Sequence, residues 1–410
     1  MHGVKSVASP TEGDSLARPR NNKLHQRFPA VEYLRRRARK RLPKFAFEYA
    51  DGGAAADTGI TRNWDALDSI EIIPRYGLVT GLPPIETKLF GRSYSAPFGI
   101  APMGGPSLVW PGADEYLARA AQAARVPYTL GTVGGMSIER GAEIAPDVLW
   151  FQLYRLARND HFLGFDLVRR AEAAGVHVLM LTLDVPVRTT RPREVASGIT
   201  SPFRPDIRML AGIMTSPGWL ASMLQNGVPR FSTLASYVGS NASVDDVAAF
   251  VKRENRGAFT WEEVARYRDR WKRPLVVKGI MHPEDAEKAI RLGVDGILVS
   301  NHGGRQVKSL PAAIDVLPAI AEQVGNRATV LMDSGIRSGS DVVCAGALGA
   351  SATLVGKAFL WALGALGQAG PAHLIDLLTD EIKAAIGQTG ATSMEETRDL
   401  LIRHAGRVRF

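Results

Sequence analysis

The sequence is poor in cysteine, because Cys344 is the only one among 410 residues. A single thiol cannot form a disulfide within the chain, so we expect a reducing compartment. Apolar neighbours on both sides of Cys344 predict a buried helix residue rather than a catalytic thiol. Apolar runs long enough to cross a membrane and an apolar secretory leader are also missing. We therefore expect a cytoplasmic protein, with peripheral contact at the inner face of the membrane as an open alternative.

Acidic residues are scarce at the start of the chain, where residues 1–44 hold twelve Lys and Arg against three acids. This excess equals the net charge of the whole chain, which is +9. Such a cluster is typical of proteins that bind nucleic acid or anionic lipid. No interleaved aromatic residues or nucleic-acid signature accompany it. We therefore predict a solvated, Arg-rich helix over Val31–Arg41 and no nucleic-acid partner.

Eight short apolar segments are typical of buried strands, and amphipathic helical patterns lie between most of them. The expected strands span residues 98–101, 128–130, 149–153, 178–183, 275–278, 296–300, 329–332 and 352–355. Strands that alternate with helices predict a parallel α/β fold, the (β/α)8 or TIM barrel. With 45% hydrophobic residues, the chain is long and apolar enough for one such barrel with extensions.

One interval breaks this rhythm, because about 90 residues separate the fourth and fifth expected strands. We interpret residues 191–260 as an excursion over the barrel mouth that serves as a lid, an oligomer contact or a membrane-surface dock. A helix is predicted over 261–271. The expected division is a flexible basic extension (1–28), the barrel with its excursion (29–390) and a C-terminal tail (391–410).

The seven residues 300–306, SNHGGRQ, follow the sixth expected strand directly. A barrel strand delivers such residues to its C-terminal end, where functional groups gather. The imidazole of His302 is suited to accept a proton near neutral pH. The guanidinium of Arg305 can bind a planar carboxylate through two parallel hydrogen bonds. A base beside a carboxylate clamp suits the removal of a proton from a small organic acid.

The ends of the seventh and eighth expected strands predict a phosphate site, which is the usual position in this fold. The features that predict it are three glycines with accessible N–H groups, two basic side chains and a helix N-terminus. They are Gly335, Gly339, Gly356, Arg337, Lys357 and the helix from Ser340.

The run 300–306, with the other strand ends, resembles the active-site signature of the FMN-dependent 2-hydroxy-acid oxidase and dehydrogenase family. The family includes glycolate oxidase, L-lactate dehydrogenase and mandelate dehydrogenase, and the resemblance covers about residues 30–390. It implies oxidation of an (S)-2-hydroxy acid to the 2-oxo acid by hydride or carbanion chemistry, with His302 as the base and Asp184 stabilising the charged imidazole. The residues implied to bind the substrate are Arg191 and Arg305 at its carboxylate, with Tyr49 and Tyr154 as hydrogen-bond donors.

The same resemblance implies FMN as the cofactor. Lys278 would lie at the N1–O2 edge of the flavin and stabilise negative charge there. Arg337 would hold the phosphate and Asp333 the ribityl chain. The other residues that the resemblance assigns to FMN are Pro102, Met103, Gly104, Gly131, Gln152, Thr182, Ser300, Gly335, Gly356 and Lys357.

The sequence departs from the family pattern at Met103, Gly131, Lys308 and Lys357. Gly104, in contrast, matches several dehydrogenases of the family, whereas its oxidases often have alanine there. This favours a dehydrogenase that passes electrons to a quinone or a cytochrome-type carrier over an oxidase that uses oxygen. The resemblance also implies a homotetramer.

Three positions bound the substrate side chain in the family, and here they are Gly105, Val133 and Arg188. Glycine and valine leave more room than the bulky residues of small-substrate oxidases. We therefore expect lactate or a larger substrate, including an aromatic, mandelate-like acid. Two alternatives stay open from sequence: an FMN barrel isomerase of the type II isopentenyl-diphosphate kind, and a non-catalytic phosphate-binding barrel.

Overall fold

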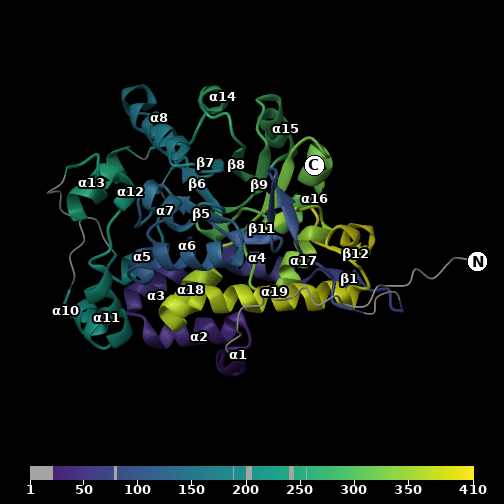
Figure 1. Cartoon of the computed structure of the whole chain (residues 1–410), viewed down its shortest axis with the longest axis horizontal. Coiled ribbons are helices and arrows are strands. Elements are labelled where there is room, and N and C mark those ends of the chain that lie inside the picture. Colours follow the sequence, from purple (N-terminus) through teal and green to yellow (C-terminus); the bar gives the residue numbers. More distant parts are fainter. Residues whose placement is uncertain (1–21, 78–80, 188, 200–205, 240–243, 255) are drawn as a thin grey trace, which may run out of the picture.

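The computed structural model describes residues 22–77, 81–187, 189–199, 206–239, 244–254 and 256–410. Eight parallel strands close into a barrel in the order in which they occur in the chain (Figure 1). They are β4 (Phe98–Ile100), β5 (Tyr128–Gly131), β6 (Leu149–Leu153), β7 (Val178–Thr182), β8 (Leu275–Ile280), β9 (Gly296–Val299), β10 (Thr329–Met332) and β11 (Ala352–Val355). The predicted (β/α)8 barrel is confirmed, and strand bounds differ from the expected ones by two residues at most.

The barrel strands form where the sequence has short apolar runs, because parallel strands are covered on both faces. All residues of β5, β6 and β7 are buried. Leu179, Val277 and Leu298 are fully inaccessible to solvent, for example. Burial of such side chains supplies about 1.5–3 kcal/mol each, and this stabilises the scaffold that holds the site.

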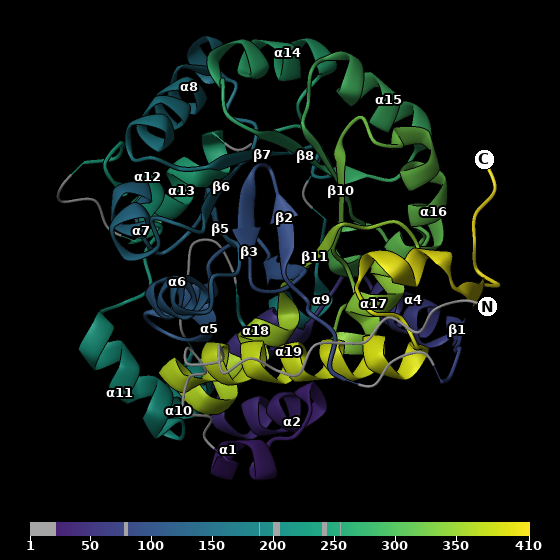
Figure 2. The same cartoon turned by 45° about the vertical axis from the view of Figure 1, so that its right-hand side comes forward.

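Helices surround the barrel, and Figure 2 shows α8, α14, α15 and α16 as an arc around it. The outer helices are α5 (Pro106–Val109), α6 (Ala113–Ala124), α7 (Ile138–Ile144), α8 (Arg158–Ala173), α14 (Trp261–Arg270), α15 (Pro283–Arg291), α16 (Ala313–Val324), α17 (Gly339–Ala347) and α18 (Lys357–Leu366). Their starts carry ordinary signals. Thr260 and Glu263 form a capping box on α14, and Pro283 occupies the first turn of α15.

Four helices precede the barrel and cover one side of it together with the long α19 (Gly370–Thr389). They are α1 (Asn22–Arg27), α2 (Val31–Arg41), α3 (Lys44–Asp51) and α4 (Thr58–Asp68). Helix α2 buries Leu34 and Ala38 against α18, where a Cβ atom at Gly364 would lie 3.0 Å from Ala38 Cβ. Its basic residues Arg36, Arg37, Arg39 and Lys40 are exposed, which confirms a solvated Arg-rich helix. Of the expected extension over 1–28, residues 1–21 lie outside the described residues.

A hairpin of β2 (Thr87–Leu89) and β3 (Arg92–Tyr94) covers the N-terminal end of the barrel (Figure 2). At its tip, the Phe90 ring packs 5.5 Å from the Trp150 ring, and His177 Nε2 lies 2.9 Å from the Phe90 carbonyl oxygen. A Cβ atom at Gly296 would lie 2.7 Å from the Phe90 ring, so β9 must begin with glycine here. The hairpin therefore closes the barrel end opposite the expected site.

The C-terminal tail is structured rather than loose. Its β12 (Leu401–Arg403) pairs antiparallel with β1 (Glu71–Ile73), so the tail is tied to the segment before the barrel. Short 3-10 turns complete the described elements: η1 (His302–Gly304), η2 (Gly367–Ala369) and η3 (Glu395–Asp399).

The excursion between β7 and β8 is helical where it is described. It contains α9 (Pro192–Ala196), α10 (Ile207–Met214), α11 (Pro217–Asn226), α12 (Ser232–Ala235) and α13 (Val244–Glu254). Trp219 Nε1 donates to the Val109 carbonyl at 3.0 Å, and Thr233 Oγ1 donates to the Met136 carbonyl at 2.8 Å. The excursion is therefore fastened to the segments that follow β4 and β5, next to the barrel mouth.

Candidate active site

A cavity of about 920 Å³, open to solvent, lies at the C-terminal ends of the barrel strands. Many residues singled out from the sequence line it. Those expected at the substrate are Tyr49, Tyr154, His302 and Arg305, and those expected at the cofactor are Pro102, Met103, Gly104, Lys278, Asp333, Gly335, Arg337, Gly356 and Lys357. The barrel therefore brings together residues that are more than 300 positions apart in the chain.

The other expected site residues lie one layer behind this lining. They are Gly131, Gln152, Thr182, Asp184, Arg191 and Ser300, and they contact lining residues or one another. Gln152 Nε2 donates to Thr182 Oγ1 at 2.8 Å, for example, and a Cβ atom at Gly131 would lie 3.5 Å from Gln152 Oε1. Arg188 lies outside the described residues.

His302 and Asp184 form the most distinctive pair of the site. His302 Nδ1 lies 2.9 Å from Asp184 Oδ1, and both side chains are largely shielded from solvent. Because an ionised carboxylate only accepts hydrogen bonds, Nδ1 carries the hydrogen and Nε2 is left as the nitrogen that can accept a proton. Burial alone would raise the pKa of Asp184, but His302 and Lys278 bring it below its ordinary value. Asp184 therefore stays ionised and ready to stabilise an imidazolium.

His302 adopts a left-handed backbone conformation, with φ at 58°. This is a strained conformation for a side chain of this size, and the surrounding hydrogen bonds hold it. His302 N–H donates to Ser300 Oγ at 3.0 Å, and Gly303 N–H donates to Ser334 Oγ at 2.9 Å. Asn301 accepts from Gly304 N–H, so the whole turn after β9 is fixed.

Lys278 is a buried ammonium surrounded by oxygen atoms. Its Nζ lies 2.5 Å from Ser300 Oγ, 3.0 Å from Asp333 Oδ2 and 3.6 Å from Asp184 Oδ2. Burial alone would lower the pKa of Lys278, but Asp184 and Asp333 raise it above its ordinary value. A permanent positive charge therefore lies at the bottom of the cavity, where it can stabilise negative charge on a bound group.

Two tyrosines approach the cavity from opposite sides. Tyr49, on α3, donates a short hydrogen bond to the carbonyl of Gly104 in the segment after β4. Tyr154 follows β6, and burial, followed by Asp184, raises its pKa to about 12. Tyr154 therefore keeps its proton at neutral pH, and both phenol hydroxyls can act as hydrogen-bond donors.

Arg305 is held by main-chain carbonyls of the N-terminal helices. Its Nη1 donates to the carbonyls of Tyr49 at 3.0 Å and of Gly52 at 2.7 Å. Arg191 Nε donates to the carbonyl of Arg305 at 3.2 Å, so the two guanidinium groups are neighbours. Burial, followed by the charge of Arg191, lowers the pKa of Arg305, which nevertheless stays a cation.

The expected phosphate cradle differs from the prediction at its helix. Helix α17 starts at Gly339 with Ser338 as its N-cap, not at Ser340. Its first N–H groups already have partners, because Asp341 accepts from Arg337 and Ser338, and Glu381 accepts from Gly339. The prediction of an accessible N–H at Gly339 was wrong, because α19 packs directly against this glycine.

Lys357 has a partner that the sequence did not predict. Its Nζ donates to the carbonyls of Ala50, Asp51 and Gly52 at 3.2, 3.1 and 2.7 Å. These carbonyls end α3, where a cation complements the negative end of the helix dipole. Burial, followed by the charge of Arg305, lowers the pKa of Lys357 well below its ordinary value.

The remaining features of the cavity suit a phosphorylated flavin. Arg337 Nη2 pairs with Asp68 at 2.7 Å, but its Nε is buried and has no hydrogen-bond partner among the described residues. Buried donors of this kind are rare in proteins unless a ligand or water satisfies them. A Cβ atom at Gly356 would have Ala101 Cβ as its nearest neighbour, at 3.7 Å, so a ligand can approach the backbone closely there. Together with the buried ammonium of Lys278, these groups fit FMN.

Sequence reasoning missed several residues of this site. Asn63 and Trp64 reach the cavity from α4, and Leu360 and Trp361 reach it from α18. The pattern of α4, which buries Ile60 and Leu67 on one face, is typical of a helix but does not show which part of the barrel the helix covers. Phe231, in the excursion, also escaped notice, although a Cβ atom at Gly105 would lie 3.7 Å from its ring.

Comparisons with known proteins agree with this geometry. The family model described as FMN-dependent dehydrogenase matches residues 38–404. An L-lactate dehydrogenase of Ectopseudomonas mendocina (strain ymp) is 39% identical over 368 residues, which cover 89% of this chain and 96% of the relative. Among solved structures, the monotopic membrane protein (S)-mandelate dehydrogenase aligns with a TM-score of 0.86 and 34% identity, over 92% of this chain and 99% of that chain. A mandelate oxidase with (S)-4-hydroxymandelic acid aligns with a TM-score of 0.79 and 36% identity, over 93% of this chain and 100% of that chain.

Proposed function

This chain belongs to the FMN-dependent dehydrogenase family, and from that premise we propose that it oxidises an (S)-2-hydroxy acid to the 2-oxo acid with His302 as the base. The pairing of His302 with Asp184 beside the buried ammonium of Lys278 carries this proposal. An isomerase or a non-catalytic barrel is not favoured, because the relatives are hydroxy-acid dehydrogenases and oxidases.

The residues of the cavity have different roles in such an oxidation. Arg305 and Arg191 bind the substrate carboxylate and fix its orientation. His302 Nε2 accepts a proton from the substrate, and Asp184 stabilises the imidazolium that forms. FMN, when bound, supplies the acceptor for the two electrons, and Lys278 is placed to stabilise the negative charge that results.

One experiment tests this function directly. The purified, FMN-loaded protein is mixed anaerobically with (S)-lactate or (S)-mandelate while flavin absorbance is followed. We expect the flavin absorbance at roughly 450 nm to bleach. We also expect the matching 2-oxo acid to accumulate. Protein that carries FMN but is not bleached by any 2-hydroxy acid would refute the proposal.

The surroundings of Gly104 and Gly105 support a substrate larger than glycolate. A Cβ atom at Gly104 would lie 2.9 Å from Val133 Cγ2, and one at Gly105 would lie 3.7 Å from Phe231 Cε1. Val133 therefore packs directly on the backbone of Gly104, and these residues and Phe231 form an apolar wall near the Tyr49 hydroxyl. We propose that a sizeable apolar or aromatic substrate side chain, as in mandelate, packs against this wall.

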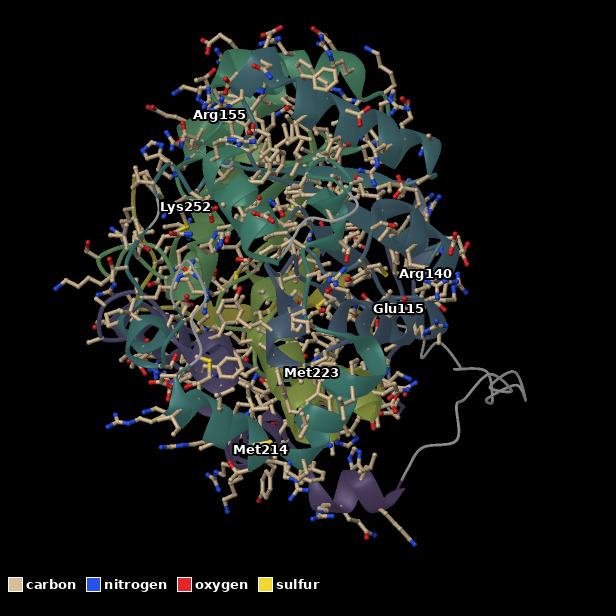
Figure 3. All side chains as sticks on the ribbon, turned by 90° about the vertical axis from the view of Figure 1, so that its left-hand side faces the viewer. Glu115, Arg140, Arg155, Met214, Met223 and Lys252 are labelled. Atoms are coloured by element: carbon tan, nitrogen blue, oxygen red, sulfur yellow. The ribbon has the colours of Figure 1, made fainter. Side chains whose placement is uncertain are left out.

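We further propose that the electron acceptor is reached at a membrane surface. Among the described residues, no helix combines the length and apolar character that a membrane span requires. Helix α10, however, exposes Ile207, Leu210 and Met214, and Met214 lies in the lower part of Figure 3. A Cβ atom at Gly218 in the next helix would lie 2.8 Å from Arg41 Nη2, so this apolar surface adjoins basic α2. An apolar helix next to basic side chains suits an anionic membrane surface.

Trp219, which lies in an apolar stretch of the same excursion, is not part of this exposed surface. This residue is buried, stacks edge-to-face on Phe45 and is fixed by its hydrogen bond to Val109. Trp219 anchors the excursion to the barrel, and the side chains of α10 are the exposed ones.

A further inference from the structure

Glu194 lies between the two arginines that the proposed function assigns to the substrate carboxylate. Its Oε1 atom is 2.6 Å from Arg305 Nη2 and 3.3 Å from Arg191 Nη1. One carboxylate oxygen therefore contacts both guanidinium groups. Glu194 is itself largely shielded from solvent, at 14% side-chain exposure, so this contact is weakly screened.

The helix that carries Glu194 is firmly attached to the N-terminal helices. Arg193, its neighbour on α9, donates to Asp57 at 2.7 Å, to Asp51 at 2.9 Å and to Glu48. Asp51 is buried and is also held by Arg35 at 2.7 Å. Helix α9 therefore presents Arg193 to α3 and α4, and Glu194 to Arg305.

The arginine pair needs such a bridge for an electrostatic reason. Two guanidinium groups repel each other, and Arg305 is too buried for water to screen its charge. Removing the partner of a buried charge is strongly unfavourable, because it leaves that charge uncompensated. Arg191 lies on the excursion and is held by Glu194 at Nη1 and by the Arg305 carbonyl at Nε, so loss of Glu194 leaves its guanidinium attached at one end only.

Glu194 does not block the site that it bridges. A guanidinium has five N–H donors. Arg305 uses two of them on the carbonyls of Tyr49 and Gly52 and one on Glu194. Its Nε–H and a second Nη2–H remain, and Arg305 lines the cavity. A substrate carboxylate can therefore accept a hydrogen bond from Arg305 while Glu194 stays in place.

We propose that Glu194 is a positioning residue that holds Arg191 and Arg305 together for the carboxylate of the 2-hydroxy acid. This inference rests on the proposed function of the two arginines. It predicts an effect opposite in sign to simple charge attraction. Removing a negative charge next to an anion site ordinarily strengthens anion binding, whereas here it disperses the arginines and weakens binding.

The test uses the FMN-loaded full chain and three variants. Glu194→Gln removes the charge, and Glu194→Asp keeps it on a shorter side chain. Glu287→Gln removes one charge on the outer face of α15, where Glu287 pairs with Arg327 and Arg291, and so controls for net charge. The measurements are the Kd of oxalate, from the change in flavin absorbance, and kcat and KM for the best hydroxy acid.

We expect Glu194→Gln to raise the oxalate Kd and the KM at least about tenfold, with a smaller change in kcat, because charge-assisted hydrogen bonds to both arginines are lost. Glu194→Asp should recover part of the affinity, and Glu287→Gln should behave like the unchanged protein. Unchanged or tighter oxalate binding by Glu194→Gln would overturn the inference, as would a Glu194→Asp variant no better than Glu194→Gln. Wild-type protein that neither binds oxalate nor is reduced by hydroxy acids would instead refute the proposed function.

Discussion

His302 Nδ1 lies 2.9 Å from Asp184 Oδ1, and this contact decides which imidazole nitrogen serves as the base. With the Nδ1 hydrogen held by the carboxylate, only Nε2 has a free lone pair. The same carboxylate lies 3.6 Å from Lys278, so the hydrogen bond from His302 and the charge of Lys278 keep it ionised. The base, its orienting acid and the buried ammonium therefore form one connected group.

The first prediction concerns this pair. His302→Asn should retain FMN, but anaerobic flavin reduction by the hydroxy acid should slow by about 10²–10⁴-fold, because the proton acceptor is gone. Asp184→Asn should also slow reduction, because an amide cannot stabilise the imidazolium equally well. Stopped-flow absorbance measures both rates. Reduction of His302→Asn at the wild-type rate would show that another group is the base.

The second prediction concerns Lys357, whose ammonium binds the carbonyls that end α3. The carbonyl of Gly52 also accepts from Arg305, so Lys357 supports the substrate arginine indirectly. Lys357→Met should raise KM and lower the melting temperature, while the Kd of FMN changes less than about tenfold, which corresponds to roughly 1.4 kcal/mol. Fluorescence titration of the apoprotein with FMN gives the Kd. A much larger loss of FMN affinity would mean that Lys357 contacts the phosphate.

The third prediction concerns substrate size. We expect kcat/KM to be higher for mandelate, 4-hydroxymandelate and 2-hydroxyoctanoate than for glycolate, with lactate between them. Phe231→Ala should change the ratio of mandelate to lactate by about tenfold, since one apolar contact group alters specificity by ~1–3 kcal/mol. Phe162→Ala, at a 68% exposed phenylalanine of α8, is the matched control. A clear preference for glycolate would contradict a binding site for large side chains next to Gly104 and Gly105.

The fourth prediction concerns membrane contact. The protein should sediment with vesicles that contain an anionic phospholipid, and added salt should weaken this binding. Replacing Ile207 and Met214 by serine should reduce binding by roughly tenfold or more, because each buried apolar side chain contributes about 1.5–3 kcal/mol. Leu401→Ser, at a leucine exposed on β12, should bind normally. Equal sedimentation of all three proteins would argue against α10 as the contact.

The fifth prediction concerns pH and the attachment of α14 to the segment after β6. Burial alone would raise the pKa of Glu263, but Arg155, the Thr260 N–H and His161 lower it to about 2. A carboxyl group with a lowered pKa stabilises the fold at pH values above its ordinary pKa of about 4.5. This stabilisation is lost as the pH falls towards 2. The melting temperature of Glu263→Gln should therefore lie below that of wild type by a constant amount above pH 5.

This difference in melting temperature should shrink below about pH 4.5, where Glu263 becomes protonated in the unfolded chain. Differential scanning calorimetry between pH 3 and pH 8 measures it. Glu322→Gln, at a 79% exposed carboxylate, is the control and should show no such trend. A difference that grows with acidity would contradict the sign of the shift.

The sequence was sufficient for those features that depend on local pattern. Each barrel strand is a short apolar run, since both of its faces are buried, and strand ends in a parallel barrel necessarily share one face. For this reason His302, Tyr154 and Lys278 could be placed around one cavity from sequence alone. Cys344 lies on a helix, as its neighbours predicted, but it is only half-buried, and this partial burial raises the pKa of its thiol to about 12.

What the sequence could not predict depends on contacts between distant segments. Lys357 meets carbonyls more than 300 residues earlier in the chain, and no local pattern distinguishes such a lysine from a phosphate ligand. Trp219 lies in an apolar stretch of the kind that membrane contacts have, yet it packs on Phe45. Glu194 follows a basic residue in a stretch that resembles any solvated helix, and only the approach of Arg305 gives it a partner.

The Phe90 hairpin has a consequence for the order of events during turnover. Phe90 and its neighbours close the N-terminal end of the barrel. We therefore expect hydroxy acid, oxo acid and oxidant to use the same opening, at the C-terminal ends of the strands. An oxo acid that is still bound in this opening would keep a bulky oxidant away from the reduced enzyme. We therefore expect reduction by the hydroxy acid and reoxidation by the oxidant to alternate. Steady-state rates measured at several oxidant concentrations should then give parallel double-reciprocal lines.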